Sequence, residues 1–280
     1  MPTYRLTLEY EGTRYRGWQE QQNARSVLGE LRRAIEEAAG TAEAIRDLGG
    51  AGRTDAGVHA LAQTAHVRLA RAVEPEAFRR AVNDQLPPDI HVLAVGRAAD
   101  DFHARHSAVT RSYLYQVSRR RTALAKRFVW WVKSPLDAGR MAAAAALLSG
   151  RHDFRLFCER PAEQTSTLVV VESAELVAAG SLVLVRLVAS HFLWKMVRRV
   201  VGTLVEVGSG RLSPAAFGAL VEGQPPRPSR SSRPAPRGDG LPAEWTAPPS
   251  GLFLERVLYP GDPPLAPLAP AVPVLGEPGR

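Results

Sequence analysis

Two kinds of hydrophobic periodicity alternate along this chain in a fixed order, and this order constrains the fold more than any other feature. Apolar and polar side chains alternate in residues 3–10, as in a strand with one buried face. Apolar residues then recur at helical spacing between a capping Ser26 and a terminating Gly40. The pattern continues with a strand at 43–49, a strand at 61–70, a helix at 74–85 and a strand at 90–95. The first part of the chain therefore predicts the order β-α-β-β-α-β.

A second run of the same kind follows. It contains a strand at 113–117, an alanine-rich helix capped by Asp137 and ending at Gly150, an apolar hairpin at 168–190, a helix at 192–207, a shorter helix from Ser213 and a strand at 251–259. The sequence thus predicts an α+β protein of two tandem β-α-β-β-α-β units, the split βαβ arrangement of RRM and ferredoxin-like modules. RNA-binding modules of this architecture use the sheet face that the helices leave open.

The 280 residues suffice for two compact units, predicted at 1–107 and 108–260. A stretch at 223–243 is rich in proline and arginine and has almost no large apolar side chains, so it is predicted to be a flexible insertion. The proline-rich tail at 261–280 is predicted to be disordered for the same reason.

The formal net charge of +8 lies almost entirely before residue 223, on the part predicted to fold. A basic folded surface favours a polyanionic partner, nucleic acid above all, although solvated charges without a specific role would give the same count. Cys158 is the only cysteine, which excludes an intramolecular disulfide and fits a reducing compartment. No apolar run approaches the length of a membrane span, so a soluble, cytoplasmic protein with no membrane partner is expected.

The sharpest local feature is the glycine-rich segment GGAGRTDAGVHA at 49–60, between two predicted strands. Its glycines allow positive φ angles, and Arg53 and Asp55 are spaced so that they can face the same way in extended backbone. An ordinary Asx turn around Asp55 is the alternative interpretation. The spacing matches neither the phosphate-loop nor the dinucleotide pattern, which disfavours a nucleotide-metabolising enzyme.

The segment GRTDAGVHA resembles the catalytic motif of the TruA family of tRNA pseudouridine synthases. Other segments resemble that family in the same order from about residue 3 to 260: YEGTRYRGWQEQ from Tyr10 to Gln21, VNDQLPPDI at 82–90, DFHARHSA at 101–108, RSYLY at 111–115, HDF at 152–154, MVRRVVGTLVEVG at 196–208 and GLFL at 251–254. The fold predicted above agrees with the pseudouridine synthase fold of that family.

The resemblance implies isomerisation of uridine to pseudouridine in the anticodon stem-loop, in this family at tRNA positions 38, 39 and 40. The C1′–N1 bond is broken, the uracil turns, and C1′ is joined to C5. Because no electrons leave the nucleotide, no cofactor or metal is implied. The family is homodimeric, so tRNA and a second copy of the chain are the expected partners. A non-catalytic tandem RNA-binding or chaperone protein is the alternative function.

The resemblance makes Asp55 the catalytic carboxylate, as a nucleophile or a base, with Arg53 beside it to favour its charged form. Arg198 corresponds to a family arginine that reaches the same carboxylate, although its pattern alone favours a solvated helix face. Tyr113 corresponds to the active-site tyrosine, whose ring can stack on uracil and whose hydroxyl can take part in proton transfer at C5. Its pattern alone also fits a core tyrosine.

The segment DFHARH offers further substrate contacts. The resemblance implies that Phe102, His103, Arg105 and His106 face the tRNA, with Arg105 suited to phosphate. The two histidines also invite a metal site, but no cluster of acidic or cysteine ligands accompanies them. One departure is that Ser166 stands where the family commonly has a basic residue.

Overall fold

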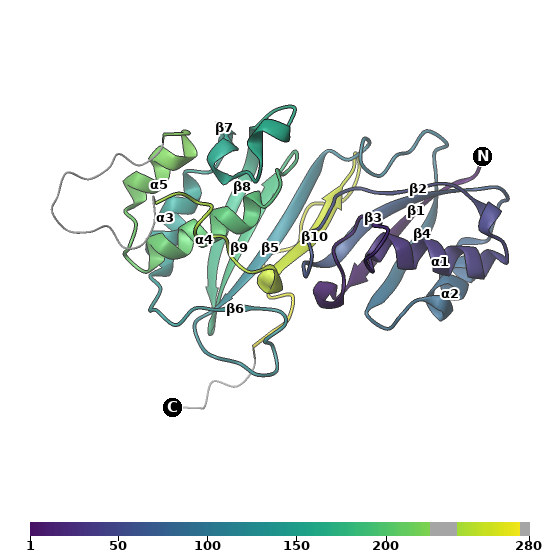
Figure 1. The fold of residues 1–280 in the computed structure, drawn as a ribbon, viewed down its shortest axis with the longest axis horizontal. Coiled ribbons are helices and arrows are strands. Elements are labelled where there is room, and N and C mark those ends of the chain that lie inside the picture. Colours follow the sequence, from purple (N-terminus) through teal and green to yellow (C-terminus); the bar gives the residue numbers. More distant parts are fainter. Residues whose placement is uncertain (225–239, 275–280) are drawn as a thin grey trace. The chain divides into compact units, whose positions relative to one another are not determined.

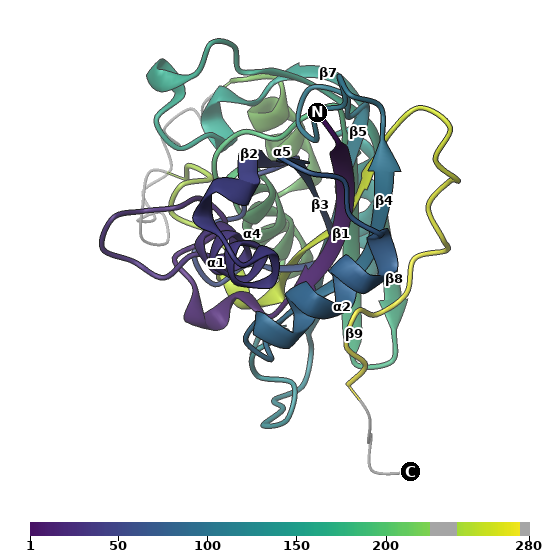
Figure 2. The ribbon, with the colours of Figure 1, turned by 90° about the vertical axis from the view of Figure 1, so that its right-hand side faces the viewer.

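The structure of this protein is a computed structural model that describes residues 1–224 and 240–274 (Figures 1 and 2). Contacts between residues divide the chain into two compact units. Unit 1 comprises Met1–Arg111 and Phe253–Leu265, and unit 2 comprises Ser112–Leu252 and Ala266–Arg280. The C-terminal strand pattern predicted at 251–259 thus groups mainly with unit 1. Each unit combines helices with a mostly antiparallel set of strands, as the predicted α+β class requires.

Unit 1 has the element order that its periodicities predicted. Its elements are β1 (Thr3–Tyr10), α1 (Val27–Ala39), β2 (Ile45–Gly50), β3 (His59–Leu69), α2 (Pro75–Gln85), β4 (Ile90–Ala98) and β10 (Leu252–Leu258). The strands lie in the order β4-β1-β3, and β2 also pairs with β3; all of these pairs are antiparallel. Strand β10 runs parallel to β3, with Phe253 opposite His59. Figures 1 and 2 show α1 and α2 side by side against these strands.

Local signals explain where the helices of unit 1 begin and end. The Ser26 hydroxyl accepts the Gly29 N–H at 3.2 Å and caps α1, while Gly40 ends it with a left-handed φ of 72°. In α2 the Glu74 carboxylate caps the first turn, which Pro75 opens. The apolar faces of these helices and of β1 form the core of the unit, which includes Tyr4, Leu6, Leu8, Leu31, Ile35 and Val82.

Unit 2 packs three helices against a second group of strands. Its elements are β5 (Thr110–Ser118), β6 (Trp130–Trp131), α3 (Ala138–Ala146), β7 (Gly150–Asp153), β8 (Leu168–Ala179), β9 (Leu182–Ala189), α4 (Met196–Gly208) and α5 (Pro214–Val221). The strands follow the order β5-β9-β8-β7, and β6 runs parallel to β5. The helices α3, α4 and α5 lie together beside these strands (Figure 1). The short strands β6 and β7 were not predicted.

Short 3-10 helices connect several of these elements: η1 (Gly12–Arg14), η2 (Ala42–Ala44), η3 (Phe154–Phe157), η4 (Pro161–Glu163) and η5 (Pro249–Gly251). The tail predicted to be disordered differs from that expectation up to residue 274. Asp262 forms an ion pair with Arg5 at 2.8 Å, and Val272 exchanges two hydrogen bonds with the Gln116 side chain. Most of the insertion predicted at 223–243 lies outside the described residues.

Gly202 sits where α4 touches the segment after the insertion, and it offers a test of this packing. A Cβ at Gly202 would lie 1.5 Å from the Trp245 carbonyl oxygen, so the backbones would have to separate. We expect Gly202→Ala to lower the free energy of unfolding by about 2 to 3 kcal/mol, although alanine normally favours a helix over glycine by about 1 kcal/mol. Urea denaturation of the purified variant measures the change.

Gly218 in α5 is the matched control for this substitution. A Cβ there meets only the flexible end of Leu147, at 3.3 Å. Gly218→Ala should therefore be neutral or stabilising by up to about 1 kcal/mol. Equal effects of the two substitutions would contradict the close contact between α4 and Trp245.

Candidate functional site

The glycine-rich loop predicted at 49–60 connects β2 to β3 in unit 1. Its tip is a tight turn in which the Val58 N–H donates to the Asp55 carbonyl at 3.1 Å. Gly57 occupies the third position of this turn with φ of 78°, a conformation that favours glycine. The Asp55 side chain is half-buried. The glycine after it in the motif therefore serves the turn that presents this carboxylate.

Thr54 connects the glycine-rich loop to Tyr10 and Trp18. Its hydroxyl lies 2.8 Å from the buried Tyr10 hydroxyl, and its carbonyl accepts the Trp18 N–H at 3.1 Å. Burial raises the pKa of Tyr10, so this hydroxyl remains neutral. Because the hydroxyl and the carbonyl of Thr54 both form hydrogen bonds, the backbone of the next residue, Asp55, has a fixed direction.

Two glycines of the N-terminal motif let residues 12–18 lie directly against this loop. A Cβ at Gly17, which has φ of 99°, would lie 2.4 Å from the Thr54 carbonyl oxygen. A Cβ at Gly12 would lie 1.9 Å from the Val58 carbonyl oxygen. The Gly12 N–H donates to His59 Nδ1 at 3.0 Å. Sequence analysis identified this motif by resemblance alone and missed its role as a support for the Asp55 loop.

Arg53 lies two residues before Asp55, in the segment that leads into the turn. The Arg53 side chain is exposed. Its guanidinium is therefore accessible to a ligand beside the loop.

The segment 101–107 of unit 1 carries the other predicted substrate contacts. Arg105 and His106 are exposed, whereas Phe102 is half-buried with its ring 5.2 Å from that of Tyr259. Arg111 connects this segment to the glycine-rich loop: its Nη2 donates to the Arg105 carbonyl at 2.7 Å and to the Ala51 carbonyl at 3.4 Å. Arg111 was not predicted as a site residue, because its only signal in the sequence is its place at the start of RSYLY.

Unit 2 carries the remaining two predicted site residues. Tyr113 on β5 is 8% exposed and packs edge-on against Phe192, with ring centroids 4.9 Å apart. Arg198 is half-buried in the first turn of α4, where its Nε donates to the Ala247 carbonyl at 2.7 Å. The solvated helix face that pattern alone favoured is therefore wrong. A cation in the first turn opposes the helix dipole, so this position gains nothing from α4 itself.

Trp18 and Trp194 have different environments. Trp18 is 1% exposed and belongs to the core of unit 1. Trp194 is 40% exposed, and the cations of Arg160 and Lys195 lie 5.4 and 5.5 Å from its ring centroid. Trp194 is therefore accessible at the surface of unit 2, whereas Trp18 is not.

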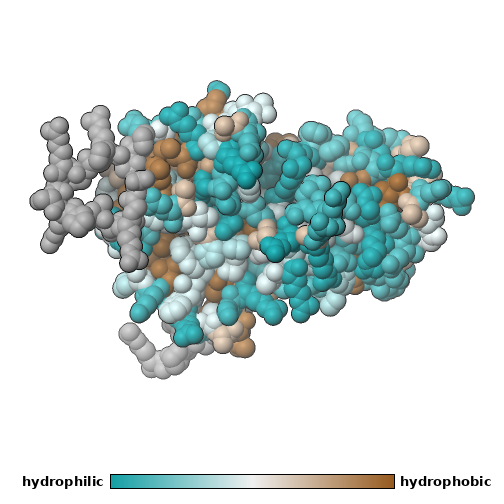
Figure 3. Space-filling view, in the orientation of Figure 1, coloured by the Kyte–Doolittle hydropathy of each residue, from teal (hydrophilic) through white to brown (hydrophobic). Residues whose placement is uncertain are grey.

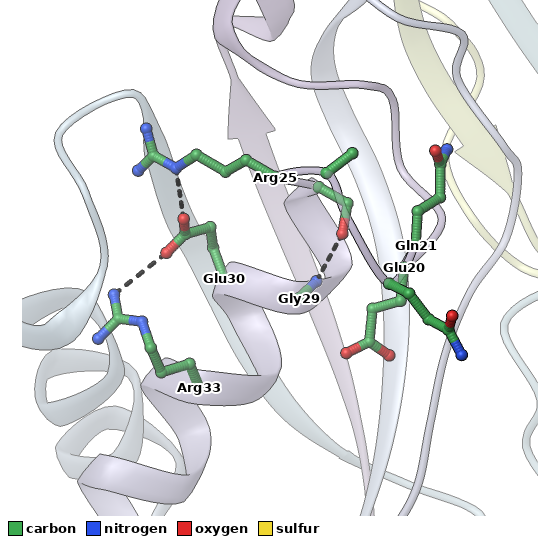
Figure 4. Close-up of a pocket in the computed structure, with 9 residues that line it drawn as sticks. Glu20, Gln21, Arg25, Gly29, Glu30 and Arg33 are labelled. Carbon is green, nitrogen blue, oxygen red and sulfur yellow. Dashed lines mark hydrogen bonds and ion pairs between the residues drawn. The ribbon is translucent and has the colours of Figure 1, made fainter.

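A hollow of about 440 Å³ lies at the start of α1 and in the segment before it (Figure 4). Its charged groups neutralise one another: Glu30 pairs with Arg25 and, at 3.1 Å, with Arg33. None of the predicted site residues lines this hollow. It therefore adds no group to the candidate site.

The described residues, 1–224 and 240–274, contain neither a metal-binding cluster nor a membrane-spanning helix. Within them, no group of three or more His, Cys, Asp or Glu side chains is arranged to hold a metal ion. No helix in this part of the chain has the length and apolar character needed to cross a membrane. The visible face of unit 1 is mainly hydrophilic, with small hydrophobic patches (Figure 3).

Comparisons with known proteins indicate one family. The family described as tRNA pseudouridine synthase matches residues 7–107 and 144–260. The tRNA pseudouridine synthase A of Mesorhizobium japonicum is 42% identical over 265 residues, which cover 93% of this chain and 100% of the relative. That of Maricaulis maris is 40% identical over 264 residues, covering 93% and 99%. A solved archaeal box H/ACA sRNP Nop10–Cbf5 complex gives a TM-score of only 0.34 at 10% identity, covering 72% of this chain and 43% of that one, and supports no conclusion.

Proposed function

This chain belongs to the tRNA pseudouridine synthase family, and we propose that the uridines it isomerises lie in the anticodon stem-loop of tRNA. Membership makes the protein an isomerase that acts on uridine in tRNA. The observation that carries the proposal is the GRTDAGVHA loop, in which Asp55 sits at the tip of a tight turn held by Thr54 and Gly57.

In the proposed reaction Asp55 is the essential carboxylate, acting as a nucleophile or as a base. The C1′–N1 bond breaks and a C1′–C5 bond forms, N1 ends with a proton, and C5 loses its hydrogen as a proton. Atoms and electrons balance within the nucleotide, so the proposal includes no cofactor. A carboxylate that serves this role must be ionised and must keep its direction, which the fixed backbone of the loop supports.

The other site residues are assigned by their chemistry. Arg53 is exposed next to the Asp55 turn, and we assign its guanidinium to favouring the charged form of Asp55 and to contacting the RNA beside the loop. Tyr113 is assigned to the uracil, through its ring and its hydroxyl. Arg198 is assigned to stabilising negative charge in the same reaction, which its permanently charged guanidinium is suited to do.

The proposal extends to assembly and architecture. Each unit is of the split βαβ type, and two copies of the chain form a homodimer in which one tRNA touches both subunits. The enzyme works in the cytoplasm, where its tRNA substrate is found. Phe102, His103, Arg105 and His106 form the part of unit 1 that contacts the tRNA outside the reacting nucleotide.

Mapping pseudouridine in cells tests the proposed specificity. Transfer RNA from cells that lack the protein should carry uridine at the anticodon stem-loop positions, and expression of the wild-type chain should restore pseudouridine there. Restoration at positions outside the anticodon stem-loop only would contradict the proposed substrate region.

Binding should also respond to salt in a characteristic way. The chain carries a formal net charge of +8, and Arg53 and Arg105 are exposed in unit 1. If several such groups contact phosphates, the logarithm of the tRNA affinity should fall linearly with the logarithm of the salt concentration, with a slope of about −0.7 to −0.9 per contact. Filter binding between 50 and 200 mM salt, roughly the range in which such effects are large, measures the slope. An affinity independent of salt would contradict a phosphate-based interface.

A further inference from the structure

The turn Ala104–His106 in unit 1 has an unusual set of acceptors for its backbone N–H groups. The Ala104 N–H donates to His66 Nδ1 at 3.2 Å. The Arg105 and His106 N–H groups donate to His103 Nδ1 at 3.2 and 3.4 Å. Three consecutive backbone donors are thus received by two imidazole nitrogens.

Side chains from other elements hold the carbonyls of the same turn. The Tyr259 hydroxyl donates to the Ala104 carbonyl at 2.6 Å, and Arg111 Nη2 donates to the Arg105 carbonyl at 2.7 Å. The backbone on both sides of Arg105 is therefore fixed, although the Arg105 side chain itself is exposed. A long cationic side chain on a rigid base loses less freedom when it meets a phosphate than one on a mobile loop.

His66 is built into unit 1 as a fixed acceptor. It lies on β3 and is 1% exposed, and its Nε2 is 3.1 Å from Asp47 Oδ2. Because Nδ1 accepts the Ala104 N–H, the ring proton belongs on Nε2, where it donates to Asp47. Gly49 on β2 lies opposite His66, and a Cβ there would be 2.7 Å from the imidazole. The glycine leaves the space that this ring occupies.

We propose that His66 and His103, as neutral hydrogen-bond acceptors, are positioning residues that hold Arg105 in place for contact with the tRNA backbone. The inference rests on the proposed function, because it takes tRNA as the ligand of Arg105. It gives a role to a buried imidazole that the isomerisation does not use.

Protonation of an imidazole is expected to break the hydrogen bonds that the ring accepts in this turn. A protonated imidazole has N–H groups at both nitrogens, so it cannot accept a backbone N–H. Burial lowers the pKa of His103, and the neighbouring His66 and His106 lower it further, which favours the acceptor form. The charged groups facing the His66 ring are Asp47 on β2 and Arg68 on β3, the latter 3.8 Å from Asp47. Protonation of His103 would break the hydrogen bonds from the Arg105 and His106 N–H groups, whereas added positive charge alone would strengthen binding to RNA.

A double-mutant cycle on tRNA binding tests the proposal with the full-length protein. His66→Leu should raise the tRNA dissociation constant roughly fivefold and reduce the salt slope by about one, the loss expected for one phosphate contact. In an Arg105→Ala background the same substitution should change the dissociation constant less than about 1.5-fold, because the positioned group is already absent. Circular dichroism and melting confirm that each variant is folded.

His66→Asn is the matched control. Its side-chain oxygen can accept the Ala104 N–H in place of Nδ1. At neutral pH it should therefore bind tRNA within about twofold of wild type, whereas His66→Leu does not.

Two outcomes overturn the proposal. One is an equal loss from His66→Leu in both backgrounds, which would mean that His66 acts through general stability. The other is no effect of Arg105→Ala on tRNA binding. Pseudouridine formation by the wild-type protein is measured in parallel, so an incorrect positioning role and an incorrect enzymatic function give different results.

Discussion

Replacing Asp55 by asparagine is expected to lower pseudouridine formation by at least about a thousandfold, a barrier increase of roughly 4 kcal/mol. Asparagine has nearly the shape of aspartate, and the backbone hydrogen bond from the Val58 N–H to the Asp55 carbonyl, which closes the turn, is unaffected by the substitution. The variant should therefore fold like the wild type. It lacks the charge and nucleophilicity that the proposed reaction requires.

Binding of tRNA by the Asp55→Asn variant should hold or increase, because an anion near the phosphate backbone has been neutralised. Tritium release from tRNA containing 5-tritiated uridine measures turnover, since bond formation at C5 expels that hydrogen. Turnover within about tenfold of wild type, a barrier change of only ~1.4 kcal/mol, would show that Asp55 is not the essential residue.

The second large effect is expected at Tyr113. Tyr113→Phe keeps the ring that packs against Phe192 and removes only the hydroxyl. If this hydroxyl takes part in proton transfer at C5, the single-turnover rate should fall by about 10² to 10⁴, with little change in melting temperature. Rapid-quench measurement at saturating tRNA gives this rate.

Tyr113→Leu serves as the comparison for the ring itself. It removes both the hydroxyl and the aromatic face, so it should weaken tRNA binding as well as slow the reaction. A Tyr113→Phe rate within about threefold of wild type would contradict a role of the hydroxyl in proton transfer and leave only the ring to act.

The elements that could be predicted from the sequence are those with signals of their own. Strand β1 follows from its alternation, α1 from Ser26 and Gly40, and α2 from Pro75. The start of α4 could not be predicted in this way. Apolar residues continue the helical pattern back to Phe192, but Lys195 has φ of 61° and the helix begins only at Met196. Hydrophobic periodicity indicates which face of a segment is apolar, but it does not indicate where the backbone leaves the helical conformation.

Long-range packing accounts for other differences between the sequence predictions and the structure. The pairing of β10 with β3 joins residues that are far apart in the chain, so no local sequence pattern predicts it. His66 alternates with apolar residues and resembles the polar side of a half-buried strand, yet it is 1% exposed. The segment that carries Ala104 and His103 covers it, as the hydrogen bond to Ala104 and the 4.3 Å ring contact with His103 show.

The candidate site was predictable to different degrees for different residues. Asp55 was identified because its motif is specific, and its environment in the structure is a fixed turn. The supporting roles of Gly12 and Gly17 were not predictable, because a close approach between two backbones is visible only in three dimensions. Arg53 was assigned a place beside Asp55 from its spacing and from the family resemblance, and its role toward that carboxylate stays a prediction.

An unmodified tRNA transcript, the purified protein and nucleotide-resolution mapping of pseudouridine test directly whether this chain isomerises uridine in the anticodon stem-loop. We expect the wild-type chain to convert uridine there in the presence of a metal chelator and without added cofactor, and the Asp55→Asn variant to bind the transcript without converting it. A wild-type protein that binds tRNA tightly but forms no pseudouridine in any tRNA would contradict this expectation and would favour a non-catalytic RNA-binding protein.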